Sequence, residues 1–340
     1  MKLILSSSPH AHARNSVSSM MRDVIIALLP AAGCSVWFFG MRSVWLMAVC
    51  VAASVVTEAV CRLLMKRDNS IGDLSAVLTG LLLALNLPPD LPLWMAVTGS
   101  VFAIAVAKQV FGGLGYNPFN PALSARAFML ISFTGAMTTW SNPVGYESVT
   151  GATSVDAVTC ATPLAFIKKG DVSQLTSLKS FLLGNIGGCI GETCAIALLI
   201  GAAYLIIRRT IAIQIPFVYI ASTVLFVVLF AVMRGDADII NLNFVVAQMC
   251  GGGLLLGAFF MATDYVTNPS TRVGQFVFAL LLGLITALIR QISISIEGVS
   301  YAIIIGNMLS PLIDRVLTPS YFGKNSKPIT AEQKGKAEKA

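Results

Sequence analysis

Three ionisable residues lie inside or at the ends of apolar stretches, where a charge is costly to hold. They are Lys108, Glu192 and Asp264. A charged side chain at the centre of a bilayer costs about 2.5–3.5 kcal/mol on insertion scales, so such residues are functional candidates by default. Hard cations prefer oxygen ligands. Glu192 or Asp264, beside carbonyls freed at a helix break, is therefore a candidate to accept Na⁺ or H⁺.

Amide side chains cluster near Pro or Gly breaks at Asn69, Asn117 and Asn120. Together with the ionisable residues they form the short list for a ligand or ion site. The simpler interpretation is that each of these residues caps a helix end or lies at the lipid headgroups. That interpretation is strongest for Arg290, a fourth charge at the end of an apolar run.

The composition indicates what must hold these residues. Hydrophobic residues make up 56% of the 340-residue chain and charged residues only 11%, whereas soluble domains contain about 25% charged residues. The mean hydropathy is +0.80. These values exclude a soluble enzyme fold as the main architecture and predict an all-α polytopic membrane protein.

Apolar runs place the membrane spans, each of which needs about 20 mostly apolar residues. Two runs, 74–87 and 127–139, are shorter and suit half-helices or tilted spans. Counting both, we predict about ten transmembrane helices. The clear candidates are residues 23–40, 45–64, 94–110, 189–207, 215–233, 244–263, 276–294 and 301–313.

Positive charges indicate the orientation, because Lys and Arg are enriched in cytoplasmic segments. With the N-terminus inside, most of the 23 Lys and Arg residues fall in cytoplasmic segments. Both termini are therefore predicted to be cytoplasmic, and the long loop 140–188 to lie outside. The net charge of +7 then reflects topology and contact with anionic lipid, so we predict the lipid bilayer and no nucleic acid as a partner.

A sequence pattern that occurs once in each half predicts an internal repeat. The sequence GLLL at residues 80–83 precedes a polar, Pro-containing segment, and GLLL at residues 253–256 does the same. Both fall in the third span of a five-span half, and an odd number of spans inverts the second half relative to the first. We therefore predict two inverted five-helix repeats with broken helices, whose ends often frame a midplane site. Chance recurrence of Gly-Leu runs is the alternative.

This topology divides the chain into five segments. They are a cytoplasmic N-terminal segment (1–22), a first five-helix repeat (23–139), an extracytoplasmic loop (140–188), a second five-helix repeat (189–314) and a cytoplasmic C-terminal tail (315–340).

The outer loop contains DAVTCATP at residues 156–163. This sequence resembles the acceptor motif for covalent flavinylation, Asp-x-x-(Ser/Thr)-x-Ala-Thr. In that chemistry a flavin transferase joins the phosphate of FMN to a Thr hydroxyl as a phosphodiester. The resemblance assigns the attachment to Thr162, within a cofactor-binding motif that also contains Asp156, Thr159, Ala161 and Pro163.

A second sequence in the loop competes with this assignment. The family motif often reads SGAT, whereas residues 159–162 read TCAT, and TGAT at residues 150–153 matches the short form more literally. We favour Thr162 over Thr153, because Asp156 stands six residues before Thr162 and Pro-Leu follows it, as in the family pattern.

Other segments extend the resemblance over nearly the whole chain. Together they are similar to the D protein of the Rnf complex and, more distantly, to the B protein of the sodium-pumping NADH:quinone reductase. The segments are SSPH at 7–10, DNS at 68–70, LTGLLLA at 78–84, PP at 88–89, AKQ at 107–109, GGLGYNPFNPA at 112–122 and GAFFMATD at 257–264.

The resemblance implies a membrane electron-carrier subunit of an ion-translocating ferredoxin:NAD⁺ oxidoreductase in the bacterial inner membrane. Covalent FMN on Thr162 would carry electrons at the outer face, and electron transfer would be coupled to Na⁺ or H⁺ transport. Riboflavin is implied as a second, non-covalent flavin. Its site or the ion path would use Asn69, Lys108, Asn117, Asn120, Glu192 and Asp264.

The implied partners are the A, B, C, E and G proteins of the Rnf complex, together with a flavin transferase for maturation. No complete active site, catalytic residue or metal site is expected on this chain alone. It has no dinucleotide or Walker fingerprint, and its seven Cys residues include no C-x-x-C pair.

A different class of function also suits ten spans with inverted, broken repeats. A small-solute channel or transporter of urea-transporter-like architecture would have no redox function, and fold alone does not determine function. The loop motif discriminates, because a channel has no use for a flavin-acceptor Thr.

Overall fold

The computed structural model describes residues 16–68, 70–140, 164, 167, 178–184, 187–235, 241–292 and 298–317. Within these residues the chain forms helices and no strand. The first half contains α1 (Val17–Phe39), α2 (Met41–Leu64), the short η1 (Ile71–Asp73), α3 (Ser75–Leu85), α4 (Leu93–Val101), the π-helix η2 (Phe102–Gln109), α5 (Pro121–Ser132) and α6 (Thr134–Met137).

The helix α8 (Leu178–Leu183) lies within the predicted outer loop 140–188. The second half then contains α9 (Ala195–Ile207), α10 (Gln214–Arg234), α11 (Leu242–Cys250), α12 (Leu254–Leu256), the π-helix η5 (Gly257–Met261), α13 (Arg272–Ile292) and α14 (Val299–Val316).

The predicted all-helical, polytopic architecture is confirmed. Among the described residues, α1, α2, α10 and α13 are each long and apolar enough to cross a membrane, and the bent pair of α11 with 254–261 is a fifth candidate span. Shorter apolar helices are α3, α4 with η2, α5 and α9. Every run predicted as a span overlaps one of these helices or α14.

Several helix boundaries differ from those predicted, and two of the differences have a local reason. The helix predicted from residue 127 begins at Pro121, because the Asn120 side chain accepts hydrogen bonds from the first free backbone amides. The helix predicted from residue 189 begins only at Ala195. Before it, the amides of Ile190 and Gly191 donate to carbonyls at the end of α3, so this stretch is bound to the first half.

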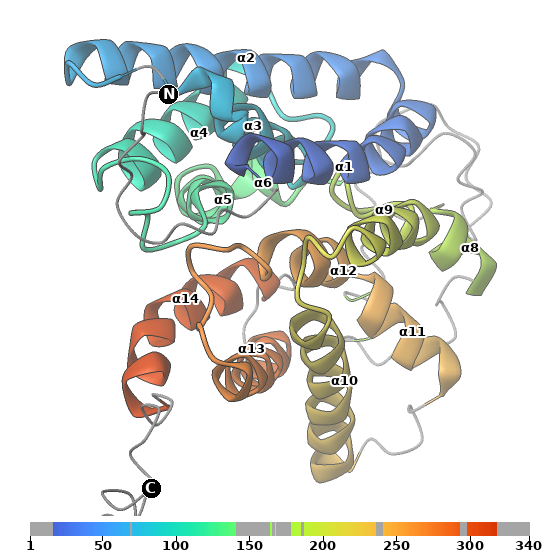
Figure 1. Cartoon of the computed structure of the whole chain (residues 1–340). Coiled ribbons are helices and arrows are strands. Elements are labelled where there is room, and N and C mark those ends of the chain that lie inside the picture. The colour runs from blue at the N-terminus through green and yellow to red at the C-terminus, as the bar shows by residue number, and fades with distance from the viewer. Residues whose placement is uncertain are drawn as a thin grey trace, which may run out of the picture.

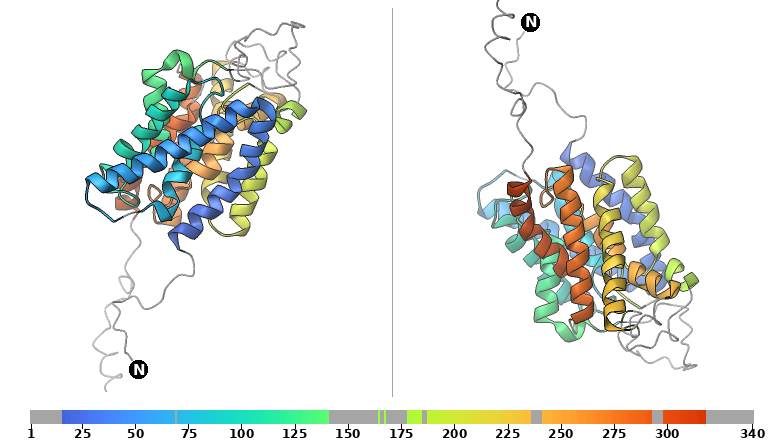
Figure 2. Two further views of the ribbon diagram at one scale, coloured as in Figure 1. Left: turned by 90° about the horizontal axis from the view of Figure 1, so that it is seen from above. Right: turned by 90° about the horizontal axis from the view of Figure 1, so that it is seen from below.

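The two halves lie against each other (Figure 1). The helices α1–α6 occupy the upper part of that view and α10–α14 the lower part, while α9 lies beside α1. From below, α10, α13 and α14 lie side by side (Figure 2). The predicted repeat pairs α1 with α9 and α5 with α14, and both pairs are in contact.

A break precedes the half-helix in the third span of each half. Leu74 (φ 59°) precedes α3, and Gly253 (φ 68°) precedes α12. In the second half, the helices on the two sides of this break are bent by 54°. A left-handed residue interrupts helical hydrogen bonding, so each break leaves a helix end inside the protein, as the predicted broken spans require.

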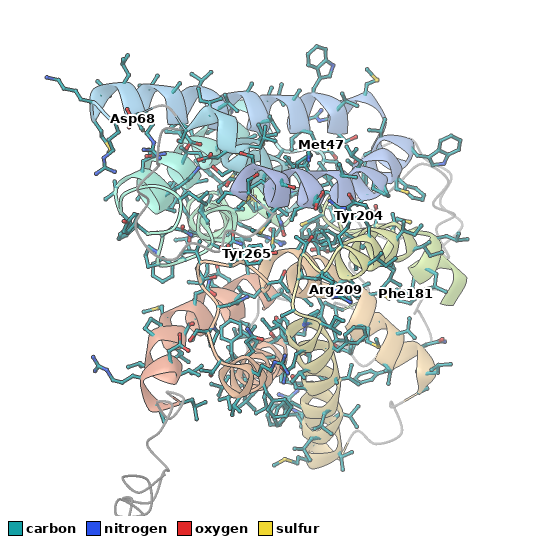
Figure 3. All side chains as sticks on the ribbon, in the orientation of Figure 1. Met47, Asp68, Phe181, Tyr204, Arg209 and Tyr265 are labelled. Carbon is teal, nitrogen blue, oxygen red and sulfur yellow. The ribbon has the colours of Figure 1, made fainter. Side chains whose placement is uncertain are left out.

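Outward-facing surfaces are apolar. Large apolar side chains such as Trp37, Leu63 and Ile207 are about four-fifths exposed, and the side chains along the outside of α2 extend away from the protein (Figure 3). Exposure of this kind is unfavourable in water and costs nothing in hydrocarbon, which agrees with a lipid-facing surface.

Close contact between α2 and α3 depends on a glycine. A Cβ atom on Gly80 would lie 2.8 Å from the carbonyl oxygen of Cys50 and 2.8 Å from Cα of Val51, both backbone atoms of α2. We expect Gly80→Val to push the helices apart at a cost of about 1–3 kcal/mol, measured as a lower melting temperature in detergent. Gly33→Val is the control, because nothing lies within 4 Å of its Cβ position. Equal losses in both variants would contradict this role for Gly80.

Candidate functional site

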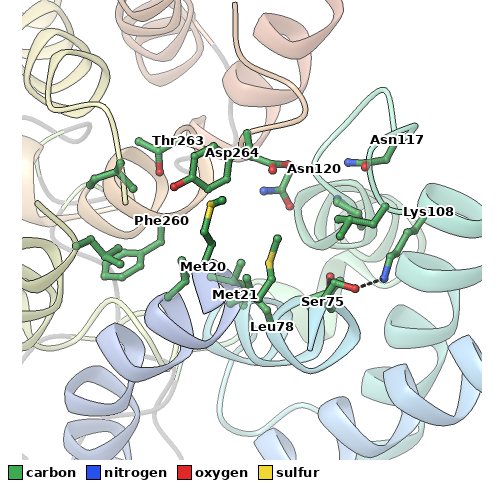
Figure 4. A pocket seen from close by; sticks show the side chains of 18 of the residues that line it. Met20, Met21, Ser75, Leu78, Lys108, Asn117, Asn120, Phe260, Thr263 and Asp264 are labelled. Carbon is green, nitrogen blue, oxygen red and sulfur yellow. Dashed lines mark hydrogen bonds between the residues drawn. The ribbon is translucent and has the colours of Figure 1, made fainter. Parts of the chain in front are cut away.

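A pocket lies where the two halves meet, at helix ends predicted to be cytoplasmic. Together with the open solvent at its mouth, the empty space between its walls is about 730 Å³. Methionine and phenylalanine side chains form its apolar walls, with polar groups along one side (Figure 4). We call it the inner pocket; its lining includes Met20, Met21, Ser75, Leu78, Thr79, Lys108, Leu114, Asn117, Asn120, Phe259, Phe260, Thr263, Asp264 and Tyr265.

The structure therefore brings four of the predicted site residues together. Lys108, Asn117, Asn120 and Asp264 all line the inner pocket. They come from the end of η2, from the loop before α5 and from the segment after η5. Tyr265, which follows Asp264, lies between the two halves in Figure 3.

The two asparagines serve different purposes. Asn120 caps α5, because its Oδ1 accepts from the amides of Ala122 (3.1 Å) and Leu123 (3.5 Å). Asn117 donates from Nδ2 to the Phe119 carbonyl oxygen at 2.9 Å. Its Oδ1 is buried and accepts no hydrogen bond. A buried acceptor without a partner is costly, so Asn117 offers an acceptor to a ligand.

A glycine-rich loop carries Leu114 and Asn117 to the pocket. Gly112, Gly113 and Gly115 all have positive φ, at 125°, 102° and 96°, which glycine adopts readily. Nη1 of Arg67, from the segment after α2, donates to the Gly112 carbonyl oxygen at 3.0 Å. The end of α2 thus holds the loop in place.

Lys108 belongs to a buried ion pair. Its Nζ lies 2.9 Å from both carboxylate oxygens of Glu58 and 2.7 Å from Oγ of Ser75. The hydroxyl of Ser70 and the amide Nε2 of Gln109 also donate to Oε1 of Glu58, at 2.7 and 3.1 Å. The side chains of Lys108 and Glu58 are 1% and 0% exposed.

Sequence reasoning missed Glu58. Its signal was an acidic residue within the predicted span 45–64, the same criterion that selected Glu192. The π-helix η2 contains both Lys108 and Gln109, and π-helical turns occur frequently at functional sites.

Asp264 is partly buried at the end of the segment 254–261. Burial raises its pKa from 3.8 to about 6, although the Val266 amide, donating to Oδ1 at 3.4 Å, opposes this. The folded protein therefore binds this proton more tightly than the unfolded chain, and the group adds stability as the pH falls through 6 toward 4.

We accordingly expect the wild type to gain more stability than Asp264→Asn between pH 7 and pH 5. The asparagine side chain does not titrate, so the difference between the two melting curves isolates this carboxyl. Thermal unfolding in detergent at both pH values measures it. Parallel changes in the two proteins would show that Asp264 titrates normally.

Glu192 lies in a second buried cluster and not in the inner pocket. Its Oε1 is 3.7 Å from Nη2 of Arg126 and has no hydrogen-bond partner. Arg126 donates to Oδ1 of Asn86 at 2.6 Å and to Sγ of Cys189 at 3.1 Å. We call these residues the Arg126 cluster; it joins the end of α3, α5 and the segment before α9.

Arg290 is buried and binds the carbonyl end of α11, so it takes the helix-capping role of the simpler interpretation and not a headgroup position. Its Nη1 donates to the carbonyl oxygen of Gln248 at 2.7 Å, and its Nη2 to that of Gly251 at 2.9 Å. The side chain thus holds the broken third span of the second half, a contact that sequence could not show.

The predicted flavin-attachment residues fall outside the described part of the chain. These are Asp156, Thr159, Ala161, Thr162 and Pro163. Asn69, predicted for the second site, also lies outside the described residues. Leu164, directly after the motif, is described and buried. Its side chain lies within 4 Å of the Cβ positions of Gly251 and Gly252, so this point of the loop contacts the second-half break.

Apolar helical spans and paired breaks in two halves define a polytopic membrane protein. Residues 4–323 match the family described as NQR2, RnfD, RnfE. The chain belongs to this family.

Relatives in the same family cover almost all of the chain. It is 46% identical to the D component of the Na⁺-translocating ferredoxin:NAD⁺ oxidoreductase complex of Acetobacterium woodii, over 95% of this chain and 96% of that protein. It is 43% identical to the D component of the proton-translocating ferredoxin:NAD⁺ oxidoreductase complex of Clostridium ljungdahlii, over 94% and 96%. The D component of the ion-translocating oxidoreductase complex of Alcanivorax borkumensis is 37% identical, over 96% and 98%.

Proposed function

We propose that this protein is the D component, a membrane electron carrier, of an ion-translocating ferredoxin:NAD⁺ oxidoreductase complex. The observation that carries the proposal is similarity along the whole chain to components of complexes with this activity. The A, B, C, E and G proteins of the Rnf complex are then its partners, in a bacterial inner membrane. Both termini would be cytoplasmic and the loop 140–188 would lie outside.

The first flavin of the proposal is FMN, joined by a phosphodiester to Thr162 in the outer loop by a flavin transferase. The sequence motif supports this attachment. Asp156 and the small residues around Thr162 would admit the transferase and the flavin phosphate to the hydroxyl. When bound, the flavin supplies reversible one- and two-electron transfer.

The inner pocket is the proposed site of a second, non-covalent flavin, riboflavin. Its apolar walls, with polar groups along one side, suit a planar ring system. The buried Oδ1 of Asn117, which accepts no hydrogen bond, suits an N–H group of that ring. The Ser75 hydroxyl adds a donor and Asp264 adds an acceptor. The chain's own residues would bind and orient the ring and exclude water from it.

An ion path through or beside this protein is the remaining part of the proposal. Asp264 at the inner pocket and Glu192 in the Arg126 cluster are the acids proposed to accept Na⁺ or H⁺. Oε1 of Glu192 is buried without a hydrogen bond, and a carboxylate oxygen in that state favours a cation or a proton.

Peptide mass spectrometry of residues 140–188 tests the attachment. The full chain is expressed together with a flavin transferase and purified, and its absorbance at about 450 nm is recorded before digestion. We expect a flavin spectrum and an FMN-bearing peptide that contains Thr162. A colourless protein with an unmodified loop would overturn the redox function and favour the solute channel.

A further inference from the structure

The ion pair of Glu58 and Lys108 forms part of the wall of the inner pocket. Lys108 and Ser75 both line the pocket, and Nζ of Lys108 donates to Oγ of Ser75 at 2.7 Å (Figure 4). Glu58, on α2, does not line the pocket. The order from α2 toward the pocket is therefore carboxylate, ammonium, hydroxyl. The positive end of the pair is nearer to any ligand.

The second half offers a comparison at the matching place in its fourth span. The dipeptide Lys108-Gln109 near the end of η2 has a counterpart in Arg290-Gln291 near the end of α13. Each basic side chain reaches the broken third span of its own half. The described hydrogen bonds of Arg290 go to Gln248 and Gly251.

Support of the break therefore explains the contacts of Arg290 and only part of those of Lys108. Lys108 meets a carboxylate and a pocket-lining hydroxyl instead of backbone carbonyls. Burying both charges of an ion pair costs desolvation free energy, so such a pair contributes little net stability. A role in the pocket explains why the pair is buried there.

We propose that the Glu58–Lys108 pair sets the electrostatic potential of the inner pocket, so that a ligand that becomes negatively charged on reduction binds more tightly when reduced. This inference rests on the proposed second flavin, and it adds how the reduction potential of that flavin is controlled. Lys108 and Glu58 act as positioning and charge-setting residues.

The charge balance of the step is simple. An isoalloxazine ring that takes up two electrons and one proton gains one negative charge, and no covalent bond to the protein forms or breaks. The electrons come from the complex or, in a test, from dithionite. An ammonium beside the ring favours the anion, and Glu58 limits that effect by neutralising part of the charge. Two further charged side chains, Arg62 on α2 and Asp73 on η1, interact electrostatically with Lys108.

The positive charge of Lys108 also acts on the ligand through the hydrogen bond to Ser75. The Ser75 hydroxyl accepts from the ammonium, and a hydroxyl polarised in this way donates its own hydrogen more strongly. A ligand oxygen or nitrogen that gains negative charge would therefore meet a stronger donor at Ser75. Glu58, held by Ser70 and Gln109, keeps the ammonium in this position.

The test measures the midpoint potential of bound riboflavin. The full chain is purified from cells without flavin transferase and loaded with riboflavin, so that the only flavin present is non-covalent. We expect Lys108→Met to lower the ratio of reduced to oxidised affinity at least tenfold, which is about 30 mV for a two-electron couple. Lys108→Arg should stay near the wild type.

Two further variants should shift the midpoint potential in the opposite direction or by a smaller amount. Glu58→Gln leaves the ammonium uncompensated and should raise the potential. The double variant Glu58→Gln/Lys108→Met should fall between the wild type and Lys108→Met. Because it leaves no lone buried charge, the double variant carries the test if Lys108→Met does not fold.

Each outcome decides between the two proposals. Unchanged potentials in Lys108→Met, or in the double variant if that one is used, would overturn the inference and leave the second flavin in place. A wild type that retains no riboflavin would overturn both. Asn117→Leu should reduce riboflavin retention, because it fills the pocket and removes the free acceptor. Full retention in that variant would place the flavin elsewhere and also overturn the inference.

Discussion

Thr162→Val is expected to abolish covalent flavin in this protein. A valine side chain has nearly the shape of threonine but no hydroxyl, and the phosphodiester to FMN cannot form without that oxygen. The measurement is flavin fluorescence of the denatured protein in a gel, after co-expression with a flavin transferase. The expected result is complete loss of the band's fluorescence at unchanged protein amount.

Thr153→Val is the matched control, because Thr153 ends the competing TGAT sequence in the same loop. It should keep the fluorescence of the wild type. If Thr153→Val loses the signal and Thr162→Val keeps it, our assignment is wrong. Asp156→Ala should lower the fraction of flavinylated protein without abolishing it, since Asp156 belongs to the recognition motif and supplies no atom to the bond.

Arg126→Met is expected to cause the largest loss of stability among the variants considered. Arg126 is 2% exposed and binds Asn86, Cys189 and Glu192. Methionine fills similar space but leaves the Glu192 carboxylate buried without its cation. Breaking one side of a buried pair costs about 3–5 kcal/mol. Thermal unfolding in detergent, followed by tryptophan fluorescence, measures the loss.

Two controls separate charge from packing. The double variant Arg126→Met/Glu192→Gln removes the lone carboxylate and should recover part of the lost stability. Arg42→Met breaks an exposed ion pair with Asp90, whose side chains are 56% and 47% exposed, and should cost no more than about 1 kcal/mol. A loss of similar size in Arg126→Met and Arg42→Met would mean that the Arg126 cluster contributes little to stability.

Several features of the fold were predictable because they depend on neighbouring residues along the chain. A membrane span is detected from the summed hydropathy of about 20 consecutive residues. The apolar runs that overlap α2, α10 and α13 can therefore be recognised from the sequence alone. Helix breaks and helix caps are harder to predict from the sequence. Asn120 and Pro121 mark the start of α5 as a cap and first-turn proline, yet the longer apolar run after them drew the predicted boundary to residue 127.

The candidate site was predictable only in part. Lys108, Asn117, Asn120 and Asp264 were selected one by one as polar residues near breaks, and the structure places all four in one pocket. Glu192 was selected by the same reasoning and lies with Arg126 instead. Nothing local distinguishes these cases, since the criterion detects the cost of burying a charge and not the partner that offsets it.

Sequence by itself determined the class of protein, the positions of its apolar helices, the family resemblance and the threonine proposed to carry FMN. Each of these depends on composition or on residues within one short segment. Only the tertiary structure decided which polar groups meet. Glu58 and Lys108 are 50 residues apart and form an ion pair of 2.9 Å, and Met20 and Asp264 share a pocket from opposite halves. Such meetings depend on how helix faces and breaks pack in space, and no local pattern along the chain records that packing.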